Sequence, residues 1–283
     1  MLTLSTCWYE LKSKFDKNIY EKWISNLLLN VNNFNLVIYS DSKSINIFNN
    51  YLKLDSHLTD NYYNTSNPKI KLIILELDEL YNYKYKNYWI KNHKNNSQLN
   101  SKIDWKLNML WSEKISFVKK TIENKFFDSK YYGWVDIGYF RCRPKPRGDI
   151  SYYNILNWPN VNKLKNLNSN YIHYALVNNN HNYIKFLYNL INNKNDKNLP
   201  INPIPPNQVS VAGGFFILTN NLIDYWFNLY DNKLKLYFQN NYLVKDDQII
   251  LIDCIFSNLK LFKLYKENNL DYDNWFLFQR VLI

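Results

Sequence analysis

The clearest pattern along the chain is a stripe of apolar residues between positions 103 and 124. Its members recur at intervals of three and four residues, which places them on one face of a helix. They are Ile103, Leu107, Leu110, Trp111, Ile115, Val118 and Ile122. The spacing predicts one continuous helix over 103–124.

Apolar positions elsewhere predict further helices that alternate with short strands. The same periodicity indicates helices over 16–30, 180–193, 221–239 and 246–257. Short apolar or alternating runs indicate strands over 2–6, 36–41, 69–77, 131–140, 209–218 and 259–265. Because strands alternate with helices, we expect an α/β fold whose mostly parallel central sheet is covered by helices on both faces.

Two segments interrupt this alternation. Residues 81–100 are polar and rich in Tyr and Asn, which predicts a mobile insertion, and the Pro-rich segment 198–208 is predicted to be a loop. Neither is a linker long enough to separate two domains. The sequence therefore predicts a single domain over 1–283.

Composition adds little to this fold prediction. A chain of 283 residues with 46% hydrophobic residues is long enough for one large globular domain. No apolar run approaches the roughly 18 residues of a membrane span, and the start of the chain lacks a secretory signal pattern. We expect no membrane span and a cytoplasmic location, which would be the host cytoplasm if the gene is viral.

The positive charge is a weak guide to partners. A formal net charge of +11 would ordinarily suggest an acidic partner. Most of it is lysine spread along a chain that is also rich in Asn, Ile and Tyr, a composition typical of an AT-rich genome. Because the lysines do not cluster, we do not expect a nucleic-acid partner, although abundant aromatic residues keep single-strand binding as a rival interpretation.

Arginine is scarce, and its placement is informative. Three of the four arginines, Arg141, Arg143 and Arg147, lie in the segment RCRPKPRGD. The planar guanidinium grips phosphate or carboxylate through paired hydrogen bonds, which lysine cannot do. This loop is a candidate site for a phosphate or an acidic acceptor, and a solvated basic loop is the alternative.

The segment WVDIGYFR carries the first candidate for chemistry. The strand over 131–140 would deliver Asp136 to its carboxyl end, the edge where open α/β sheets bind ligands. Gly138 would let the backbone turn and approach a ligand. A carboxylate that holds a divalent cation commonly neutralises a diphosphate. Alternatively, Asp136 caps a turn.

Lys114 is the second candidate, because it lies inside the apolar stripe of the predicted helix 103–124. A lysine on a buried face is costly unless it is paired or its amino group reaches solvent. Its ammonium is either aimed at a diphosphate or held in a structural salt bridge.

Several of these segments together resemble a known family. The run from 106 to 141, the sequence GGFF at 213–216 and DDQ at 246–248 resemble the bacterial HtrL/YibB-like family, which is similar to GT-A glycosyltransferases. The opening of the chain, with YEKW followed by LVIYSD, fits as well. The resemblance implies a single GT-A-like domain, with a nucleotide-sugar-binding half over 1–140 and an acceptor-side half over 141–283.

The resemblance also implies a metal position. Asp136 stands where the first aspartate of the family's DxD metal motif would be, but Gly138 replaces the second carboxylate. The last histidine, His181, precedes DDQ, so the late histidine ligand of many GT-A enzymes is absent. A divalent cation, Mn²⁺ or Mg²⁺, is therefore an open alternative to neutralisation by Lys114 and the arginines.

The later motifs are implied to serve the acceptor. By resemblance, Gly213 and Gly214 lie under the donor sugar and the acceptor, and Asp247 is the base that deprotonates the acceptor hydroxyl, with slight preference over Asp246. The dipole of the predicted helix is expected to keep the base ionised with a low pKa. A β-bulge at the glycines and simple helix capping by the aspartates are the alternatives.

In this fold the donor nucleoside would lie over the first strand–helix units. Tyr39 is then a candidate to stack on the base, Asp41 to bind the ribose, and Thr6 to contact the donor from the first strand. Strand-end capping is the alternative for each.

These expectations combine into one function. They indicate a glycosyltransferase that moves a sugar from a nucleotide-sugar donor to a glycan or other hydroxyl acceptor, with inversion of the anomeric centre. A catalytically inactive carbohydrate- or nucleotide-binding protein of the same fold is the main alternative, and a nucleotidyltransferase is another.

Overall fold

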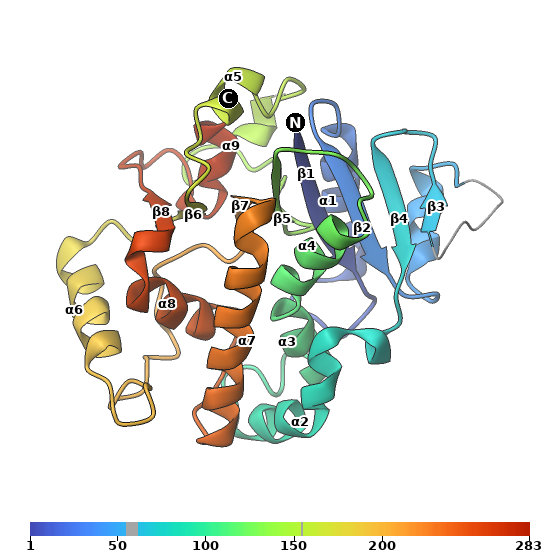
Figure 1. The fold of residues 1–283 in the computed structure, drawn as a ribbon. Helices are drawn as coiled ribbons and strands as arrows, with labels where there is room; N and C mark the ends of the chain where they lie inside the picture. The colour runs from blue at the N-terminus through green and yellow to red at the C-terminus, as the bar shows by residue number, and fades with distance from the viewer. Residues whose placement is uncertain (55–61, 154) are drawn as a thin grey trace.

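The computed structural model describes residues 1–54, 62–153 and 155–283. They form one eight-stranded mixed sheet with helices on both faces (Figure 1). The predicted α/β class and the largely parallel central sheet are confirmed. In this described part, no helix is both long and apolar enough to cross a membrane.

The sheet is parallel at its centre and mixed toward one edge. Its strands are β1 (Leu2–Trp8), β2 (Asn35–Ser40), β3 (Tyr62–Asn64), β4 (Ile70–Ile74), β5 (Tyr131–Val135), β6 (Ile172–Ala175), β7 (Phe215–Thr219) and β8 (Phe262–Tyr265). They follow the order β3-β4-β2-β1-β5-β7-β6-β8. Strands β4, β2, β1 and β5 run parallel, β7 is antiparallel to both β5 and β6, β6 and β8 are parallel, and β3 is antiparallel to β4.

Helices cover each face with its own hydrophobic core. They are α1 (Lys17–Leu29), α2 (Lys86–Asn95), α3 (Trp105–Trp111), α4 (Lys114–Glu123), α5 (Val161–Lys165), α6 (His181–Asn192), α7 (Ile223–Gln239), α8 (Asp247–Ser257) and α9 (Leu277–Val281). One core lies under α2, α3, α4, α6, α7 and α8, and the other lies under α1, α5 and α9. Strands β2, β5 and β7 are buried along their whole length, as expected for strands covered on both faces.

The prediction of one helix over 103–124 is wrong, because the chain breaks between α3 and α4. Ser112 ends α3, and Glu113 turns its buried carboxylate to the backbone N–H groups of Tyr81 and Asn82, at 2.8 and 3.0 Å. Burial raises the pKa of Glu113 to about 7, although these donors lower it. The break therefore gives α4 a new start at Lys114.

The prediction of a mobile insertion over 81–100 is also wrong. The segment forms a 3₁₀ turn and then helix α2, whose Trp89 is fully buried. The Asn92 amide donates to the carbonyl of Val244 at 2.7 Å and accepts from its N–H at 2.9 Å. The segment thus anchors the loop that leads into α8.

Several shorter elements differ from the sequence prediction. Strands β3 and β6 were not predicted, since each is only three or four residues long. Strand β7 begins at Phe215 rather than at 209, and β5 ends at Val135, so Asp136 opens the turn that follows it. The Pro-rich segment 198–208 is a connector without helix or strand, as predicted.

Candidate functional site

A cavity of about 360 Å³ opens at the carboxyl ends of β1 and β5. This is the edge at which open α/β sheets bind ligands. The walls come from the end of β1, the loop before α1, helices α1 and α3, the start of α4, the turn after β5, the glycine pair before β7 and the start of α8. Segments from both halves of the chain therefore meet around one space.

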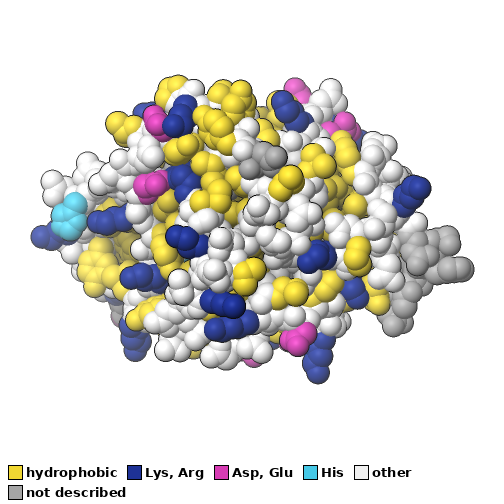
Figure 2. All heavy atoms as spheres, turned by 90° about the horizontal axis from the view of Figure 1, so that it is seen from above, with side chains coloured by type: hydrophobic (Ala, Val, Ile, Leu, Met, Phe, Trp, Pro, Cys, Tyr) yellow, Lys and Arg dark blue, Asp and Glu magenta, His cyan; other side chains and the backbone are white. Residues whose placement is uncertain are grey.

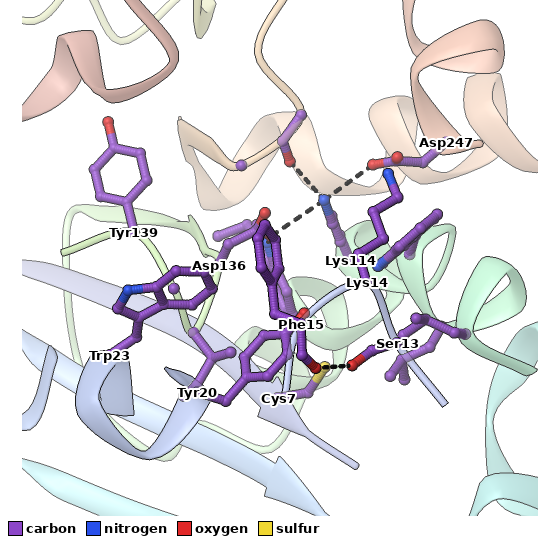
Figure 3. A pocket seen from close by; sticks show the side chains of 18 of the residues that line it. Cys7, Ser13, Lys14, Phe15, Tyr20, Trp23, Lys114, Asp136, Tyr139 and Asp247 are labelled. Atoms are coloured by element: carbon purple, nitrogen blue, oxygen red, sulfur yellow. Dashed lines mark hydrogen bonds and ion pairs between the residues drawn. The ribbon is translucent and has the colours of Figure 1, made fainter. Parts of the chain in front are cut away.

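Lys114 lies at the centre of the site (Figure 3). Its Nζ is 3.1 Å from Oδ1 of Asp136 and 3.0 Å from Oδ2 of Asp247, and it donates to the carbonyl oxygen of Gly213 at 2.8 Å. An ammonium has three N–H donors, and three acceptors surround this one. The lysine joins two carboxylates that are more than a hundred residues apart in sequence.

The charge balance at Lys114 favours its protonated form. Burial alone would lower the pKa of Lys114, but the carboxylates of Asp136 and Asp247 outweigh burial and raise it above its ordinary value. The structure thus confirms pairing as the solution for this buried lysine, in place of an amino group that reaches solvent. Its direct contact with a diphosphate stays a prediction.

Asp136 faces the cavity from the end of β5. Its Oδ1 accepts from the indole Nε1 of Trp134 at 2.6 Å as well as from Lys114, and its side chain is 43% exposed. Its backbone N–H donates to the carbonyl of Gly214 at 2.8 Å. The side chain is held by Trp134 and Lys114 and makes no turn cap in the described residues, where Oδ2 has no hydrogen-bond or ion-pair partner.

Asp247 is the first residue of α8, and its side chain is 10% exposed. The expected low pKa is wrong: burial raises the pKa of Asp247 to about 6, and Asp246 and Asp136 add to this, against the lowering effect of Lys114. The helix terminus does not offset desolvation here. A carboxylate whose pKa lies near 6 titrates close to neutral pH.

Asp246 occupies the N-cap position of α8 without forming a side-chain cap. Its Oδ2 pairs instead with Nζ of Lys245 at 2.8 Å. Asp246 also lines the cavity, but it carries its own counter-ion, whereas Asp247 shares Lys114 with Asp136. Simple capping therefore explains neither aspartate.

The glycine pair precedes β7 rather than forming a bulge within it. A Cβ on Gly213 would lie 3.0 Å from Oδ2 of Asp247, and a Cβ on Gly214 would lie 3.1 Å from Oδ2 of Asp136. The missing side chains thus let both carboxylates approach the backbone. Contact with a sugar stays a prediction for this pair.

Gly138 is required by packing rather than by an unusual backbone angle, since its φ lies outside the left-handed region. A Cβ at this position would lie 2.6 Å from Cε3 of Trp23. The glycine lets the turn after β5 lie flat against the indole, which itself lines the cavity.

The three clustered arginines have different places. Arg141 lines the cavity, with its guanidinium carbon 4.3 Å from the ring centroid of Trp23. Arg143 lies 2.9 Å from Asp273 and 3.7 Å from the buried Asp149, and Arg147 is exposed outside the cavity lining. Only Arg141 is positioned as the sequence predicts for a ligand contact.

The structure does not bring Tyr39, Asp41 and Thr6 into the cavity lining. The Tyr39 ring is fully buried, stacks on Phe117 with centroids 4.7 Å apart and bonds to Thr121, so it cannot stack on a base in this conformation. Asp41 accepts from the backbone N–H of Ser44 at 2.8 Å, which is a capping role. The Thr6 side chain is fully buried within the fold.

Aromatic rings make up much of the lining, and sequence reasoning missed most of them. They are Trp8, Tyr9, Phe15, Tyr20, Trp23, Trp111, Trp134, Tyr139, Trp275 and Phe276. Ser13, Lys14 and Phe15 come from the loop that directly follows the first strand. The position of that loop at a carboxyl edge was a signal that could have identified it.

The carboxylates already have a protein cation. The described residues contain no cluster of three or more His, Cys, Asp or Glu side chains placed to hold a metal. A divalent cation on Asp136 would lie beside the Lys114 ammonium, which is 3.1 Å from Oδ1 and would repel it. This donor set does not fit the metal that the DxD comparison implies.

No family model matches the chain, and no curated protein sequence matches it.

Proposed function

We propose that this protein is a GT-A-type glycosyltransferase that moves a sugar from a nucleotide-sugar donor to a hydroxyl of a glycan or another acceptor. The observation that carries the proposal is the ion-paired group of Asp136, Lys114 and Asp247 in a cavity at the carboxyl edge of the sheet. The resemblance to the HtrL/YibB-like family supports the same assignment. Localisation in the cytoplasm belongs to this proposal as well.

In the proposed reaction Asp247 is the base. Its Oδ2 is held by Lys114, and Oδ1 makes no hydrogen bond in the described part of the chain, so it can accept the acceptor's hydroxyl proton. The acceptor oxygen then forms a bond to the anomeric carbon as the bond to the diphosphate breaks. The electron pair of that bond leaves with the nucleoside diphosphate. Attack from the opposite side inverts the anomeric centre.

The two halves of the chain contribute different parts of this site. Asp136 and Lys114 come from the proposed nucleotide-sugar half, 1–140, and Asp247 comes from the proposed acceptor half, 141–283. Asp136 is the more exposed carboxylate, and its partners Lys114 and Trp134 both contact Oδ1. We assign it to donor hydroxyls and assign Asp247 to the acceptor.

The rival functions fit the site less well. Figure 2 shows lysines and arginines spread over the visible face rather than gathered in one patch, which does not favour a nucleic-acid binder. A sugar- or nucleotide-binding protein without activity would keep the aromatic cavity, but it has no need for Asp136 and Asp247 together on one buried lysine.

The direct test is a thermal-shift screen of nucleoside diphosphates together with an assay of donor hydrolysis. At about 100 times its dissociation constant, a ligand that binds only the native state adds roughly 2.7 kcal/mol, or about 5 °C in the unfolding midpoint. We expect one nucleoside diphosphate to give such a shift and the matching nucleotide sugar to be turned over. Failure of the whole panel to shift the midpoint would end the proposal, and binding without turnover would favour the inactive alternative.

We also expect the transfer rate to rise with pH through about 6. Burial raises the pKa of Asp247 to about 6, and a general base works only when it is ionised. Below that pH, kcat/KM should fall about tenfold for each pH unit. The measurement is a pH–rate profile between about pH 5 and pH 8, with the unfolding midpoint followed in parallel to exclude acid unfolding. A flat profile over this range would remove Asp247 from the role of base.

A further inference from the structure

The cations that line the cavity differ in whether a carboxylate neutralises them. Lys114 has two carboxylate partners, but Lys14 and Arg141 have none within ion-pair distance in the residues that the structure describes. Both of these side chains line the cavity. In Figure 3 Lys14 lies on the Asp247 side, and Trp23, on which Arg141 stacks, lies on the Asp136 side.

Arg141 is held in place with its binding edge free. Its guanidinium carbon lies 4.3 Å from the ring centroid of Trp23 and 5.2 Å from that of Phe276. Its Nε donates to the carbonyl of Gly138 at 2.9 Å, and its two terminal nitrogens have no hydrogen-bond partner in the described residues. A stacked guanidinium keeps its in-plane N–H groups for a paired contact with phosphate oxygens.

Lys14 approaches from the loop between β1 and α1. Its Nζ lies 5.0 Å from the ring centroid of Trp111, and no hydrogen bond to Nζ is formed within the described part of the chain. All three N–H donors of this ammonium are therefore open to a ligand. The same loop carries Phe15, whose ring packs edge-on against Trp23 at 5.1 Å.

The pKa shifts of the three cations also separate Lys14 and Arg141 from Lys114. Burial lowers the pKa of Lys14, and burial together with the neighbouring Arg143 lowers the pKa of Arg141. The carboxylates instead raise the pKa of Lys114. Asp246 and Asp247 act on Lys14, and Asp136 acts on Arg141, but none of them is within ion-pair distance, so both cations can pair directly with a bound anion.

We propose that Lys14 and Arg141 form a clamp for the diphosphate of the donor, which binds without a divalent cation. The proposal rests on the proposed function, and it names the residues that recognise the leaving group. A diphosphate carries about two or more negative charges near neutral pH, which matches two cations that line the cavity without an ion-pair partner. Lys114 is not assigned to the clamp, because its three donors already contact Asp136, Asp247 and Gly213.

The experiment measures binding of inorganic pyrophosphate to the full chain by calorimetry, in the presence of EDTA. We expect binding in EDTA, with affinity lowered about tenfold or more in Lys14→Gln and in Arg141→Gln, and lost in the double variant. The pyrophosphate affinity of Arg141→Lys should lie between those of Arg141→Gln and the wild type, because lysine keeps the charge but loses the paired N–H groups of the guanidinium. Unfolding midpoints of all variants show whether the fold is intact.

Matched controls lie in the same two segments. Lys12 bonds to the carbonyl of Ser101, Arg147 is exposed, and neither lines the cavity. Lys12→Gln and Arg147→Gln should leave pyrophosphate affinity within about twofold of the wild type. Equal losses in the controls would show that only the overall charge matters and would overturn the clamp.

Two further results would also overturn it. One is pyrophosphate binding that requires added Mn²⁺, and the other is no binding with or without the metal. These outcomes are separable from failure of the proposed function. If sugar transfer is found but both substitutions leave pyrophosphate affinity unchanged, the glycosyltransferase proposal is supported and the clamp proposal is wrong. If Lys14 and Arg141 bind pyrophosphate but no nucleotide sugar is turned over, the anion-binding site is supported and the glycosyltransferase proposal is wrong.

Discussion

Replacement of Asp247 by asparagine is expected to lower the rate of sugar transfer by about 10²-fold or more, which is the usual contribution of a general base. Asparagine is nearly isosteric and its carbonyl oxygen can still accept from Lys114, but it cannot take a proton. Nucleoside diphosphate affinity should stay within about threefold of the wild type, because the change is on the acceptor side. The measurements are steady-state transfer rates and calorimetric affinity.

Asp224 provides the matched control for this substitution. Like Asp247 it lies in the first turn of a helix and pairs with a lysine, here Lys119, but it is exposed and outside the cavity. Asp224→Asn should leave transfer unchanged. If Asp246→Asn is damaging and Asp247→Asn is silent, the base is Asp246. If neither change lowers the rate, these carboxylates are not catalytic.

The stereochemistry of the product is an independent test of Asp247 as the base. A single displacement assisted by one carboxylate inverts the anomeric centre, and the anomeric proton signal in NMR reports the configuration directly. A product that retains the donor's configuration would require a different mechanism, in which Asp247 has no role as the acceptor's base.

Local sequence patterns were enough to predict most of the helices and strands of the fold. The apolar runs at β1, β2, β4 and β5 and the periodic stretches at α1, α6, α7 and α8 predicted these elements, because each is encoded in neighbouring residues. The break before α4 was not predictable in this way. It depends on contacts of Glu113 with the backbone of Tyr81 and Asn82, about 30 residues away.

The site was predictable where a residue broke a local rule. Lys114 stood out as a charge inside an apolar stripe, and that conflict indicated a partner, which proved to be the carboxylates of Asp136 and Asp247. Tyr39 broke no such rule. A tyrosine near a strand end is compatible with a ligand contact or with the core, and packing on Phe117 decides for the core. Only the tertiary structure separates these cases.

Burial also explains the wrong expectation for Asp247. Its place in the first turn of a helix is visible in the sequence and favours ionisation. The desolvation that raises its pKa comes from walls contributed by distant segments, so it is not encoded locally. The same reasoning explains why Arg141 could be separated from Arg143 and Arg147 only when their partners were known.

Replacement of Lys114 by methionine is expected to lower the free energy of unfolding by about 3–5 kcal/mol at about pH 8, as when one partner of a buried ion pair is removed. Methionine keeps much of the stem's volume, but Asp247 is left buried and ionised beside Asp136 without their shared cation. The measurement is equilibrium urea unfolding. Lys119→Met is the matched control, since Lys119 lies on the same helix and pairs with Glu123 and Asp224, both largely exposed. It should cost less than about 1 kcal/mol.

The pH dependence and a double variant identify the charge as the cause. Without Lys114 the pKa of Asp247 should rise above its present value of about 6, because the lysine lowers it. A carboxyl whose folded-state pKa is raised destabilises the protein as it ionises, so the loss should shrink as pH falls below that pKa. Lys114→Met combined with Asp247→Asn should recover much of the stability, because no uncompensated charge is then buried. If the loss is equal at low and high pH and the double variant recovers nothing, Lys114 stabilises the fold through packing of its stem rather than through its charge.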